Sequence, residues 1–242
     1  HDWNEDHMLF ASVARGYKAG GTNIYPNEEI TDFGYGSYDT EHLWNYEVGL
    51  RSEWLDGDVT TNVITFYLDR EDAQFRDSIG SGVTYGYFTN NTDSAKHYGL
   101  EADATWYICK QLSVSGSLGL LKTETNYVDR DLSNSPNYTY NARIDYQSDC
   151  GFFANFQMSG SDDYFESNSH EEKREEFAVF NAAIGYRYEG WTFTLWAKNL
   201  FDEGYEKRIF YFANNTPDYD DVKRFEDPAD PQQFGITANY SW

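Results

Sequence analysis

The sequence predicts an all-β protein, an antiparallel up-and-down transmembrane β-barrel to which this chain contributes about ten strands. Three observations predict this fold. Ten segments alternate apolar and polar residues with a period of two, their connections alternate between short and long, and aromatic residues gather at both ends of the segments. Alternation alone also fits a soluble β-sandwich, so the other two observations decide between the two folds.

The ten predicted strands follow one another along the whole chain. In residues 44–54, for example, Trp44 and Val48 fall on one parity and Glu47 falls on the other. Successive side chains of a strand point to opposite faces, so each segment has one apolar and one polar face. The last segment, "FGITANYSW", keeps this pattern to its final residue. The predicted strands are residues 9–18, 44–54, 59–74, 98–108, 112–123, 138–146, 151–161, 177–188, 191–201 and 234–242.

The connections alternate strictly between two lengths. Short turns are predicted near residues 4–6 and at 55–58, 109–111, 147–151 and 188–190. Long polar stretches rich in Asp and Tyr fill the other places, at residues 19–43, 76–94, 124–136, 162–176 and 204–233. Tight turns on the periplasmic side and extended loops on the outer side are typical of outer-membrane barrels. A Greek-key sandwich has no reason to keep this asymmetry.

Aromatic rings occupy both ends of the predicted strands, with aliphatic residues between them. Such rings suit the two interfaces of a bilayer, where a side chain is half in lipid and half in water. The rings predicted at the outer ends are Trp44, Tyr46, Tyr98, Tyr138 and Tyr140. Those predicted at the inner ends are Trp54, Trp106, Tyr146, Tyr186, Tyr188, Trp191, Tyr240 and Trp242.

Composition and charge exclude several other classes. No apolar run approaches the roughly 18 residues that a membrane helix needs. The formal net charge of −23 argues against a nucleic-acid partner, which requires a basic surface. Cys109 and Cys150 lack metal-ligand spacing, and we expect free thiols. The acidic opening "HDWNEDHMLF" does not resemble a signal peptide, so we expect one that was removed, or a chain that is part of a longer protein.

Five stretches resemble one family, the TonB-dependent outer-membrane receptors. In chain order they are "ARGYKAGGTN" (residues 14–23), "LWNYEVGLRSEW" (43–54), "YGLEADATW" (98–106), "NLFDEGY" (199–205) and the terminal "FGITANYSW". The resemblance implies a barrel of about 22 strands, filled by an N-terminal plug domain, in the outer membrane of a Gram-negative bacterium. It also implies a TonB-type energy-coupling complex that acts through a short N-terminal box.

The chain departs from this family pattern in its extent. Residues 1–242 match only the C-terminal portion of such a barrel, with the plug domain and the N-terminal strands absent from this chain. An open ten-stranded sheet in lipid would leave unpaired backbone groups along two edges. We therefore expect the chain to be a fragment of a receptor roughly three times longer.

The function implied by the resemblance is energised import of a scarce nutrient across the outer membrane. A ferric siderophore is the first choice of cargo, because it is the family's commonest one. Sugar oligomers, cobalamin or haem remain open as cargo for a receptor of the same family. A passive pore or a structural barrel is the alternative from a different class. The expected partners are outer-membrane lipid, the coupling complex and a small-molecule ligand, with no cofactor and no nucleic acid.

Charged residues of the polar parity are interpreted as facing the barrel interior. Glu101 and Asp103 share one face of a strand, and such a pair can do acid–base work, but a solvated lumen explains it without catalysis. The five histidines are scattered without metal-binding spacing, and no nucleophile motif is present, so we expect neither an enzyme nor a metal site. The residues predicted to face the lumen are Glu47, Arg51, Glu101, Asp103 and Arg143.

Aromatic and Arg residues of the long connections are the candidates for ligand binding. Rings pack on planar or sugar-like ligands, and cations attract anionic iron chelates, although the same rings could pack the loops on one another. The candidates are Tyr25, Phe33, Tyr35, Tyr38, Tyr85, Tyr87, Tyr164, Phe165, Arg208, Tyr211 and Phe212. The acidic stretch 217–231 offers oxygen ligands for calcium, but its spacing fits no known calcium loop.

Overall fold

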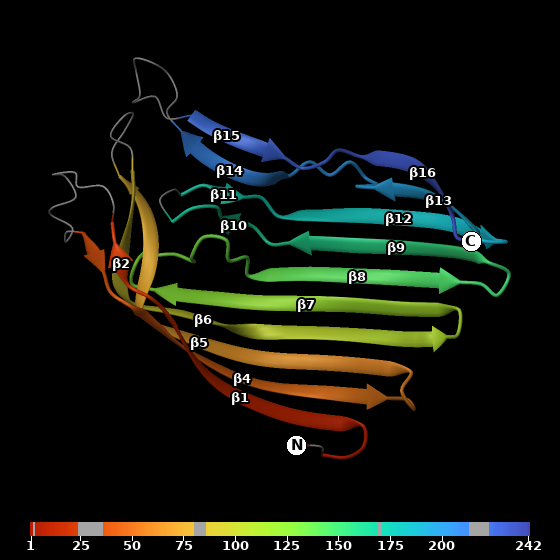
Figure 1. The fold of residues 1–242 in the computed structure, drawn as a ribbon, viewed down its shortest axis with the longest axis horizontal. Coiled ribbons are helices and arrows are strands. Elements are labelled where there is room, and N and C mark those ends of the chain that lie inside the picture. The colour runs from red at the N-terminus through yellow and green to blue at the C-terminus, as the bar shows by residue number, and fades with distance from the viewer. Residues whose placement is uncertain (2, 24–35, 80–85, 169–170, 213–222) are drawn as a thin grey trace.

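The computed structural model describes residues 1, 3–23, 36–79, 86–168, 171–212 and 223–242. Ten strands form a single antiparallel sheet whose spatial order follows the chain (Figure 1). The all-β up-and-down fold is thus confirmed, and each predicted segment corresponds to one strand of the sheet. The strands are β1 (His7–Lys18), β4 (Glu41–Trp54), β5 (Val59–Ile79), β6 (Gly86–Cys109), β7 (Leu112–Thr125), β8 (Tyr138–Gln147), β9 (Phe152–Ser161), β12 (Phe177–Tyr188), β13 (Trp191–Lys198) and β16 (Gln233–Tyr240).

The sheet is open at both sides. Among the described residues, β1 and β16 are its two edges, and neither has a partner strand beyond it. The short turns lie at one end of the sheet and the long connections at the other (Figure 1). No helix among the described residues is long and apolar enough to span a membrane.

The strand registers place apolar side chains of neighbouring strands in common rows. Leu50 of β4 stands opposite Val63 of β5. At the other side of the sheet, Leu195 of β13 stands between Ile184 of β12 and Ile236 of β16. Directly opposed residues share a face, so one face of the whole sheet is apolar.

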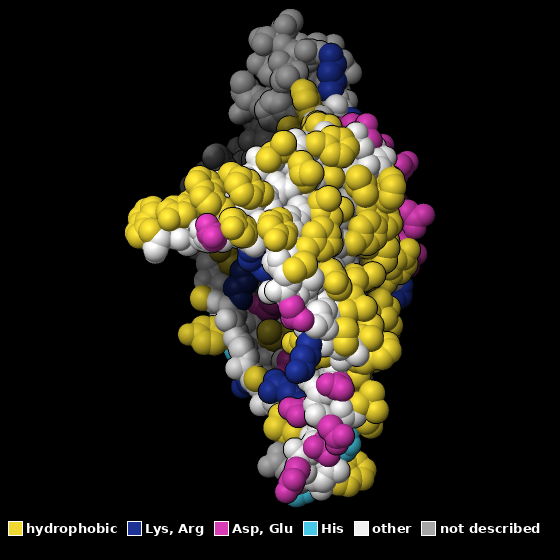
Figure 2. Space-filling view, turned by 90° about the vertical axis from the view of Figure 1, so that its right-hand side faces the viewer, with side chains coloured by type: hydrophobic (Ala, Val, Ile, Leu, Met, Phe, Trp, Pro, Cys, Tyr) yellow, Lys and Arg dark blue, Asp and Glu magenta, His cyan; other side chains and the backbone are white. Residues whose placement is uncertain are grey.

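This apolar face is exposed. Leu195 is 51% exposed and Ile236 is 76% exposed. Hydrophobic side chains crowd one side of the sheet, while Lys, Arg, Asp and Glu are visible in its hollow (Figure 2). A soluble sheet would cover such a face with a second layer, and no described element does so. The surface therefore has the character of one that faces lipid.

Rings and then charges mark the outer end of the apolar face. Tyr46, Tyr67 and Tyr98 form one row across three strands, with neighbouring ring centroids 6.4 and 6.3 Å apart. Two residues farther out, Asp69 stands opposite Lys96. Charged side chains are costly in hydrocarbon, so the row of Asp69 and Lys96 lies at or beyond the lipid headgroups.

Rings also mark the inner end. Val59 stands between Trp54 and Trp106 in one row. The ten steps along the strand from Val59 to Asp69, at about 3.3 Å each and tilted by about 40°, cover about 25 Å along the membrane normal. This height equals that of the lipid-facing band of outer-membrane barrels.

The short connections are tight turns that use left-handed backbone conformations. Leu55, Asp56 and Gly57 have φ values of 54°, 57° and 91°. Gly151 has a φ of 94°, and a Cβ there would collide with the backbone carbonyl of Arg187. A glycine is therefore required at this turn.

Two neighbouring inner turns are joined to each other. The Gln111 side chain donates a hydrogen bond to Asp149 at 3.3 Å, and the Gln147 backbone N–H donates to the Gln111 carbonyl at 2.8 Å. Cys109, the last residue of β6, and Cys150, in the second turn, are exposed free thiols, as expected.

The long connections contain more strand than the sequence predicts. The prediction of a loop over residues 76–94 is wrong, because β5 and β6 continue as a paired hairpin to Ile79 and Gly86. Both faces of this extension lie beyond the membrane boundary, so its strands carry no apolar alternation that could reveal them. Three further short pairs join β2 (Gly21–Thr22) to β3 (Ser37–Tyr38), β10 (Tyr164–Phe165) to β11 (Lys173–Arg174), and β14 (Glu206–Phe212) to β15 (Lys223–Pro228).

The β5–β6 hairpin bends at Asp72, whose φ is 53°. A positive φ in a strand interrupts the alternation of its faces. Phe75 consequently packs in a buried cluster with Ala95 and Leu132, although continued alternation would turn it to the apolar face. Phe75 also stacks on Tyr127, with ring centroids 4.5 Å apart. The bent hairpin is thereby packed on the connection between β7 and β8.

Candidate functional site

The second face of the sheet is polar, and it carries the residues predicted to face the lumen. Arg51, Asn62 and Asp103 stand in one row across β4, β5 and β6. The Asn62 side chain donates a hydrogen bond to Asp103 at 3.1 Å. Glu47, on the same face of β4, accepts hydrogen bonds from Ser12 at 3.2 Å and from Asn45 at 2.6 Å.

The remaining two predicted lumen residues lie on the same face. Glu101 of β6 stands opposite Gly119 of β7, and Arg143 of β8 forms an ion pair with Asp145 at 2.6 Å. Because β4, β6 and β8 are not neighbours in the sheet, the predicted residues are spread over the face and do not converge on one point. The described residues contain no group of three or more His, Cys, Asp or Glu side chains that could hold a metal ion. The arrangement suits a hydrated wall.

Aromatic rings on this polar face lie over glycines of the neighbouring strand, a feature that the sequence analysis missed. The pairs are Phe10 over Gly49, Phe66 over Gly99, Phe153 over Gly185, and Trp196 over Gly235. Cations sit above three of these rings: Arg51 is 5.1 Å from the Phe10 centroid, Arg187 is 4.5 Å from Phe153, and Lys198 is 5.5 Å from Trp196. A large ring fits here only because the facing residue has no side chain. Glycines at polar-parity positions are the signal in the sequence.

We expect Gly185→Ala to destabilise the folded sheet by about 1–3 kcal/mol, the usual cost of overpacking. The added Cβ would collide with the Phe153 ring and with the Phe193 backbone carbonyl, which cannot move without disturbing the strand pairing. Gly16→Ala is the matched control, because its Cβ would lie 3.8 Å from Leu43, an ordinary contact. Reversible unfolding in lipid vesicles measures both changes, and equal effects would contradict the role given to the ring.

The ligand-binding candidates that the structure describes lie at the outer end of the sheet. Tyr25, Phe33, Tyr35 and Tyr85 fall outside the described residues, as does the side chain of Phe212. The others are distributed over four strands: Tyr38 is in β3, Tyr87 in the outer part of β6, Tyr164 and Phe165 in β10, and Arg208 and Tyr211 in β14. Arg76 lies 4.2 Å from the Tyr87 ring centroid, and Arg208 lies 5.1 Å from that of Phe210.

Arg130 joins the connection between β7 and β8 to β10. Its guanidinium lies 3.9 Å from the Phe165 ring centroid and donates hydrogen bonds to the carbonyls of Ser167 at 3.0 Å and Asn168 at 3.2 Å. The Asn134 backbone N–H donates to the Phe165 carbonyl at 2.8 Å. An open groove of about 420 Å³ beside Arg130 and Phe165 is also lined by charged side chains of both signs: Lys122, Glu124, Asp129, Asp131 and Lys173.

Arg174 of β11 holds the other side of the arm formed by β10 and β11. The side chain is buried and lies over three rings, with centroid distances of 5.3 Å to Tyr164, 4.9 Å to Phe177 and 5.4 Å to Tyr205. It also donates a hydrogen bond to the Tyr164 hydroxyl. Burial raises the pKa of the nearby Glu166 carboxyl above its usual range, although the charge of Arg174 opposes this shift. Tyr164 and Phe165, two of the candidates, are thus held by cations on both sides.

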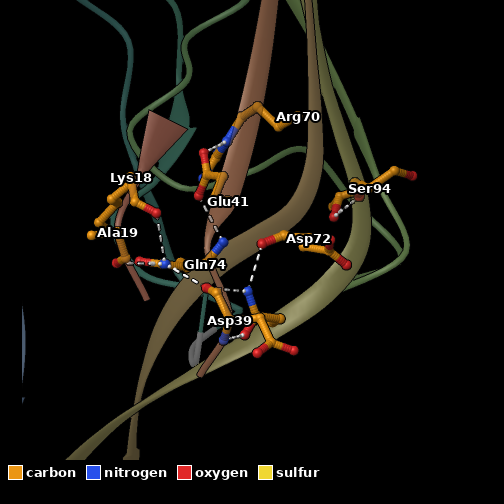
Figure 3. A network of polar contacts seen from close by, with 10 residues as sticks. Lys18, Ala19, Asp39, Glu41, Arg70, Asp72, Gln74 and Ser94 are labelled. Atoms are coloured by element: carbon orange, nitrogen blue, oxygen red, sulfur yellow. Dashed lines mark hydrogen bonds and ion pairs between the residues drawn. The ribbon is translucent and has the colours of Figure 1, made fainter. Parts of the chain in front are cut away.

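A second network fixes the base of the bent hairpin (Figure 3). Arg70 donates two hydrogen bonds to the Glu41 carboxylate, at 2.7 and 2.9 Å, and the Gln74 backbone N–H donates a third at 2.7 Å. The Gln74 side chain donates to the backbone carbonyls of Lys18, Ala19 and Asp39, at 3.3, 3.1 and 2.8 Å. The hairpin and the connection between β1 and β4 are therefore joined through side chains that are largely buried.

The "NLFDEGY" stretch, residues 199–205, ends β13 and positions β14 through the hydrogen bonds of Asn199. Asn199 has a φ of 48°, which ends the strand before residue 201, the predicted boundary. Its side chain accepts a hydrogen bond from the Glu203 backbone N–H at 2.8 Å, and donates to the carbonyls of Glu203 at 2.8 Å and Asp230 at 3.2 Å. Both ends of the β14–β15 arm are thereby fastened to one buried amide.

The sequence matches the family model described as "TonB dependent receptor-like, beta-barrel" over residues 1–200. The pesticin receptor of Yersinia pestis is 24% identical over 221 residues, which cover 88% of this chain and 31% of that protein. The pesticin receptor of Yersinia enterocolitica is 31% identical over 102 residues, covering 42% of this chain and 14% of that protein. The chain thus spans about a third or less of the relatives that it matches.

Solved structures share the fold. The ferric yersiniabactin uptake receptor FyuA from Yersinia pestis has a TM-score of 0.79 at 19% identity, over 99% of this chain and 36% of that one. The copper transporter OprC has a TM-score of 0.75 at 15% identity, over 100% of this chain and 38% of that one. The ferripyoverdine receptor of the Pseudomonas aeruginosa outer membrane has a TM-score of 0.70 at 16% identity, over 99% and 32%.

Proposed function

Because the chain belongs to the TonB-dependent receptor family, we propose that it forms the C-terminal portion of an active importer whose cargo is a ferric siderophore. Receptors of this family lie in the outer membrane of Gram-negative bacteria, and this chain is an outer-membrane protein. In the proposed whole receptor, further strands and a plug domain complete the barrel, and a TonB-type periplasmic partner supplies energy through the N-terminal part.

The observation that carries this proposal is a sheet with one apolar and one polar face. At its outer end, the long connections are packed on one another. Its apolar face suits lipid, and its polar face, with Glu47, Arg51 and Asp103, suits a hydrated interior in contact with a plug. The edges β1 and β16 need partner strands in a membrane, since unpaired backbone groups are costly there. Both features support a piece of a larger barrel.

The outer arms support a binding role. Arg130 and Arg174 immobilise Phe165 and Tyr164, so these rings are held in place before a ligand arrives. A preorganised aromatic surface loses less conformational entropy on binding than mobile loops do. The similarity to siderophore and copper transporters is a likeness of fold. The choice of a ferric siderophore follows from its being the family's commonest cargo.

The test is uptake of radiolabelled ferric siderophores by cells that produce the complete receptor, with and without the coupling protein. We expect uptake that saturates with concentration and disappears without the coupling protein, because a plugged barrel admits no free diffusion. Maltodextrins and cobalamin serve as control solutes. Saturable, coupled uptake of one of these would keep the transporter and discard iron as the cargo. Uptake that rises linearly and ignores the coupling protein would replace the proposal with a passive pore.

A further inference from the structure

The chain's negative charge is concentrated at its outer end. The described connections and arms at that end lie within residues 19–40, 71–94, 126–137, 162–176 and 199–232. Their described residues include 20 Asp and Glu residues but only 8 Lys and Arg residues. The described part of the outer end therefore carries a net charge of −12, whereas the described sheet and inner turns, with 14 acidic and 10 basic residues, carry −4.

The few cations of this region are already engaged. Lys173 pairs with Asp163 at 3.0 Å, and Lys207 pairs with Asp230 at 3.1 Å. The same holds for the three guanidinium groups that form ion pairs or hydrogen bonds. Arg130 pairs with Glu171 at 3.7 Å, Arg174 binds the Tyr164 hydroxyl, and Arg224 pairs with Glu226 and, at 3.8 Å, with Glu206.

An anionic ligand would have to displace carboxylates from Lys173, Lys207, Arg130 and Arg224, and the Tyr164 hydroxyl from Arg174. Arg76 and Arg208, the two other Arg residues of the outer end, lie over the rings of Tyr87 and Phe210. Binding an anion there would bring it into a field of the same sign, which slows its approach and weakens its binding.

We propose that the cargo is a ferric chelate of neutral or positive net charge, of the hydroxamate type, and not an anionic catecholate complex. Three hydroxamates, each losing one proton, neutralise ferric iron, whereas three catecholates, each losing two, leave the complex anionic. The carboxylates act in this proposal through their summed field and not as metal ligands. The inference rests on the proposed transport function and narrows its cargo. It differs from the expectation that loop cations attract anionic chelates.

The experiment compares three ferric complexes on the complete receptor in detergent. The first probe is a linear trihydroxamate complex that ends in a protonated amine. The second is its uncharged N-acetyl derivative, and the third is a tripodal tricatecholate complex. Stopped-flow fluorescence gives association rates at ionic strengths of about 10 mM and about 150 mM, where the screening lengths are about 30 Å and about 8 Å. We expect the cationic complex to bind fastest at low salt, and its rate to fall by about threefold or more at high salt.

A matched pair of variants locates the effect. Asp129→Asn, Glu175→Gln and Asp227→Asn together remove three exposed charges from the outer end. Asp56→Asn, Asp58→Asn and Glu189→Gln remove three exposed charges from the inner turns. Only the outer variant should slow the cationic complex, by about threefold at low salt. If a variant fails to assemble, the salt dependence of the unmodified receptor still tests the sign of the field that the cationic complex meets.

The outcomes separate this inference from the proposed function. Saturable binding in which the tricatecholate is fastest and tightest would overturn the inference and leave the siderophore receptor standing. Equal effects of the outer and inner variants would also overturn it. If none of the three complexes binds saturably, the proposed cargo class fails, and this inference fails with it.

Discussion

Leu118→Arg should destabilise the folded receptor in lipid by about 2–4 kcal/mol, the cost of a cationic side chain at the bilayer midplane. Leu118 lies in the middle of β7, opposite Ala102 and Tyr140 on the apolar face, and is 41% exposed. An Arg there must either enter hydrocarbon or deform the bilayer around it. Reversible unfolding in vesicles measures the change, and the yield of assembled receptor in the outer membrane gives a second measurement.

Ser117→Arg is the control for this substitution. Ser117 is the adjacent residue of the same strand, but it stands between Asp103 and Asn141 on the polar face. An added cation there meets carboxylates and water, so we expect a change within about 0.5 kcal/mol. Gly99 of β6 also lies on the polar face, but it is unsuitable as a control position because a Cβ there would collide with the Leu120 carbonyl. A similar loss of stability for both Arg variants would contradict the assignment of the two faces.

Glu41→Ala should cost about 3–5 kcal/mol, because it leaves the Arg70 guanidinium without its carboxylate in a largely buried site. The Glu41 and Arg70 side chains are 8% and 20% exposed, and the pair is bidentate. Loss of Glu41 also removes the acceptor for the Gln74 backbone N–H. The base of the β5–β6 hairpin should therefore loosen, and limited proteolysis of intact cells should cut the variant faster near residues 71–94.

Asp163→Ala removes one partner of an ion pair of similar length for comparison. Asp163 and Lys173 are 3.0 Å apart, but their side chains are 41% and 44% exposed. Exposed pairs contribute at most about 1 kcal/mol, since water and salt screen them. A cost for Asp163→Ala as large as that for Glu41→Ala would show that burial does not set the strength of these pairs.

Period-two alternation predicted the ten strands of the sheet because the sheet has one face for lipid and one for water. Leu50 and Glu47, for example, belong to faces with different surroundings, so apolar and polar residue types alternate along the strand. The lengths of the connections predicted which ends of the strands lie together. These two signals sufficed for the fold class and for the parity of each strand.

The outer arms could not be predicted in the same way. Beyond Asp72 the paired β5–β6 hairpin extends past the row of Asp69 and Lys96, and thus past the lipid boundary, so no lipid-facing alternation marks its strands. The left-handed conformation of Asp72 also reverses the expected facing of Phe75, and no sequence pattern announced it. Patterns of single residues cannot reveal contacts that depend on the meeting of two distant loops.

The contacts of the candidate ligand residues likewise join loops that are distant in the sequence. Tyr164 and Phe165 were selected as aromatic residues of a loop, but Arg130 and Arg174, which hold them, were not. Arg130 reaches Phe165 from a different connection, 35 residues earlier in the chain. The rings over glycines were missed for a related reason, because each requires the register of two strands. The candidate site residues themselves remain predictions until binding is measured.

The most direct test of the account is the environment of consecutive side chains along β7. Single cysteines at positions 115–122, in a receptor with Cys109→Ser and Cys150→Ser, carry a spin label whose contact with lipid-soluble and water-soluble relaxation agents is measured. Two positions separate the register from simple hydropathy. Leu121 is apolar but lies opposite Gly99 on the polar face, and Lys122 is charged but shares the face of Tyr98.

We expect labels at the even positions 116, 118 and 120 to contact the lipid-soluble agent. Labels at 115, 117, 119 and also 121 should be shielded from it, and the label at 122 should mark the outer lipid boundary. Loss of the alternation, or a label at Leu121 that contacts lipid as strongly as one at Leu120, would contradict the two-faced sheet on which the proposed receptor depends.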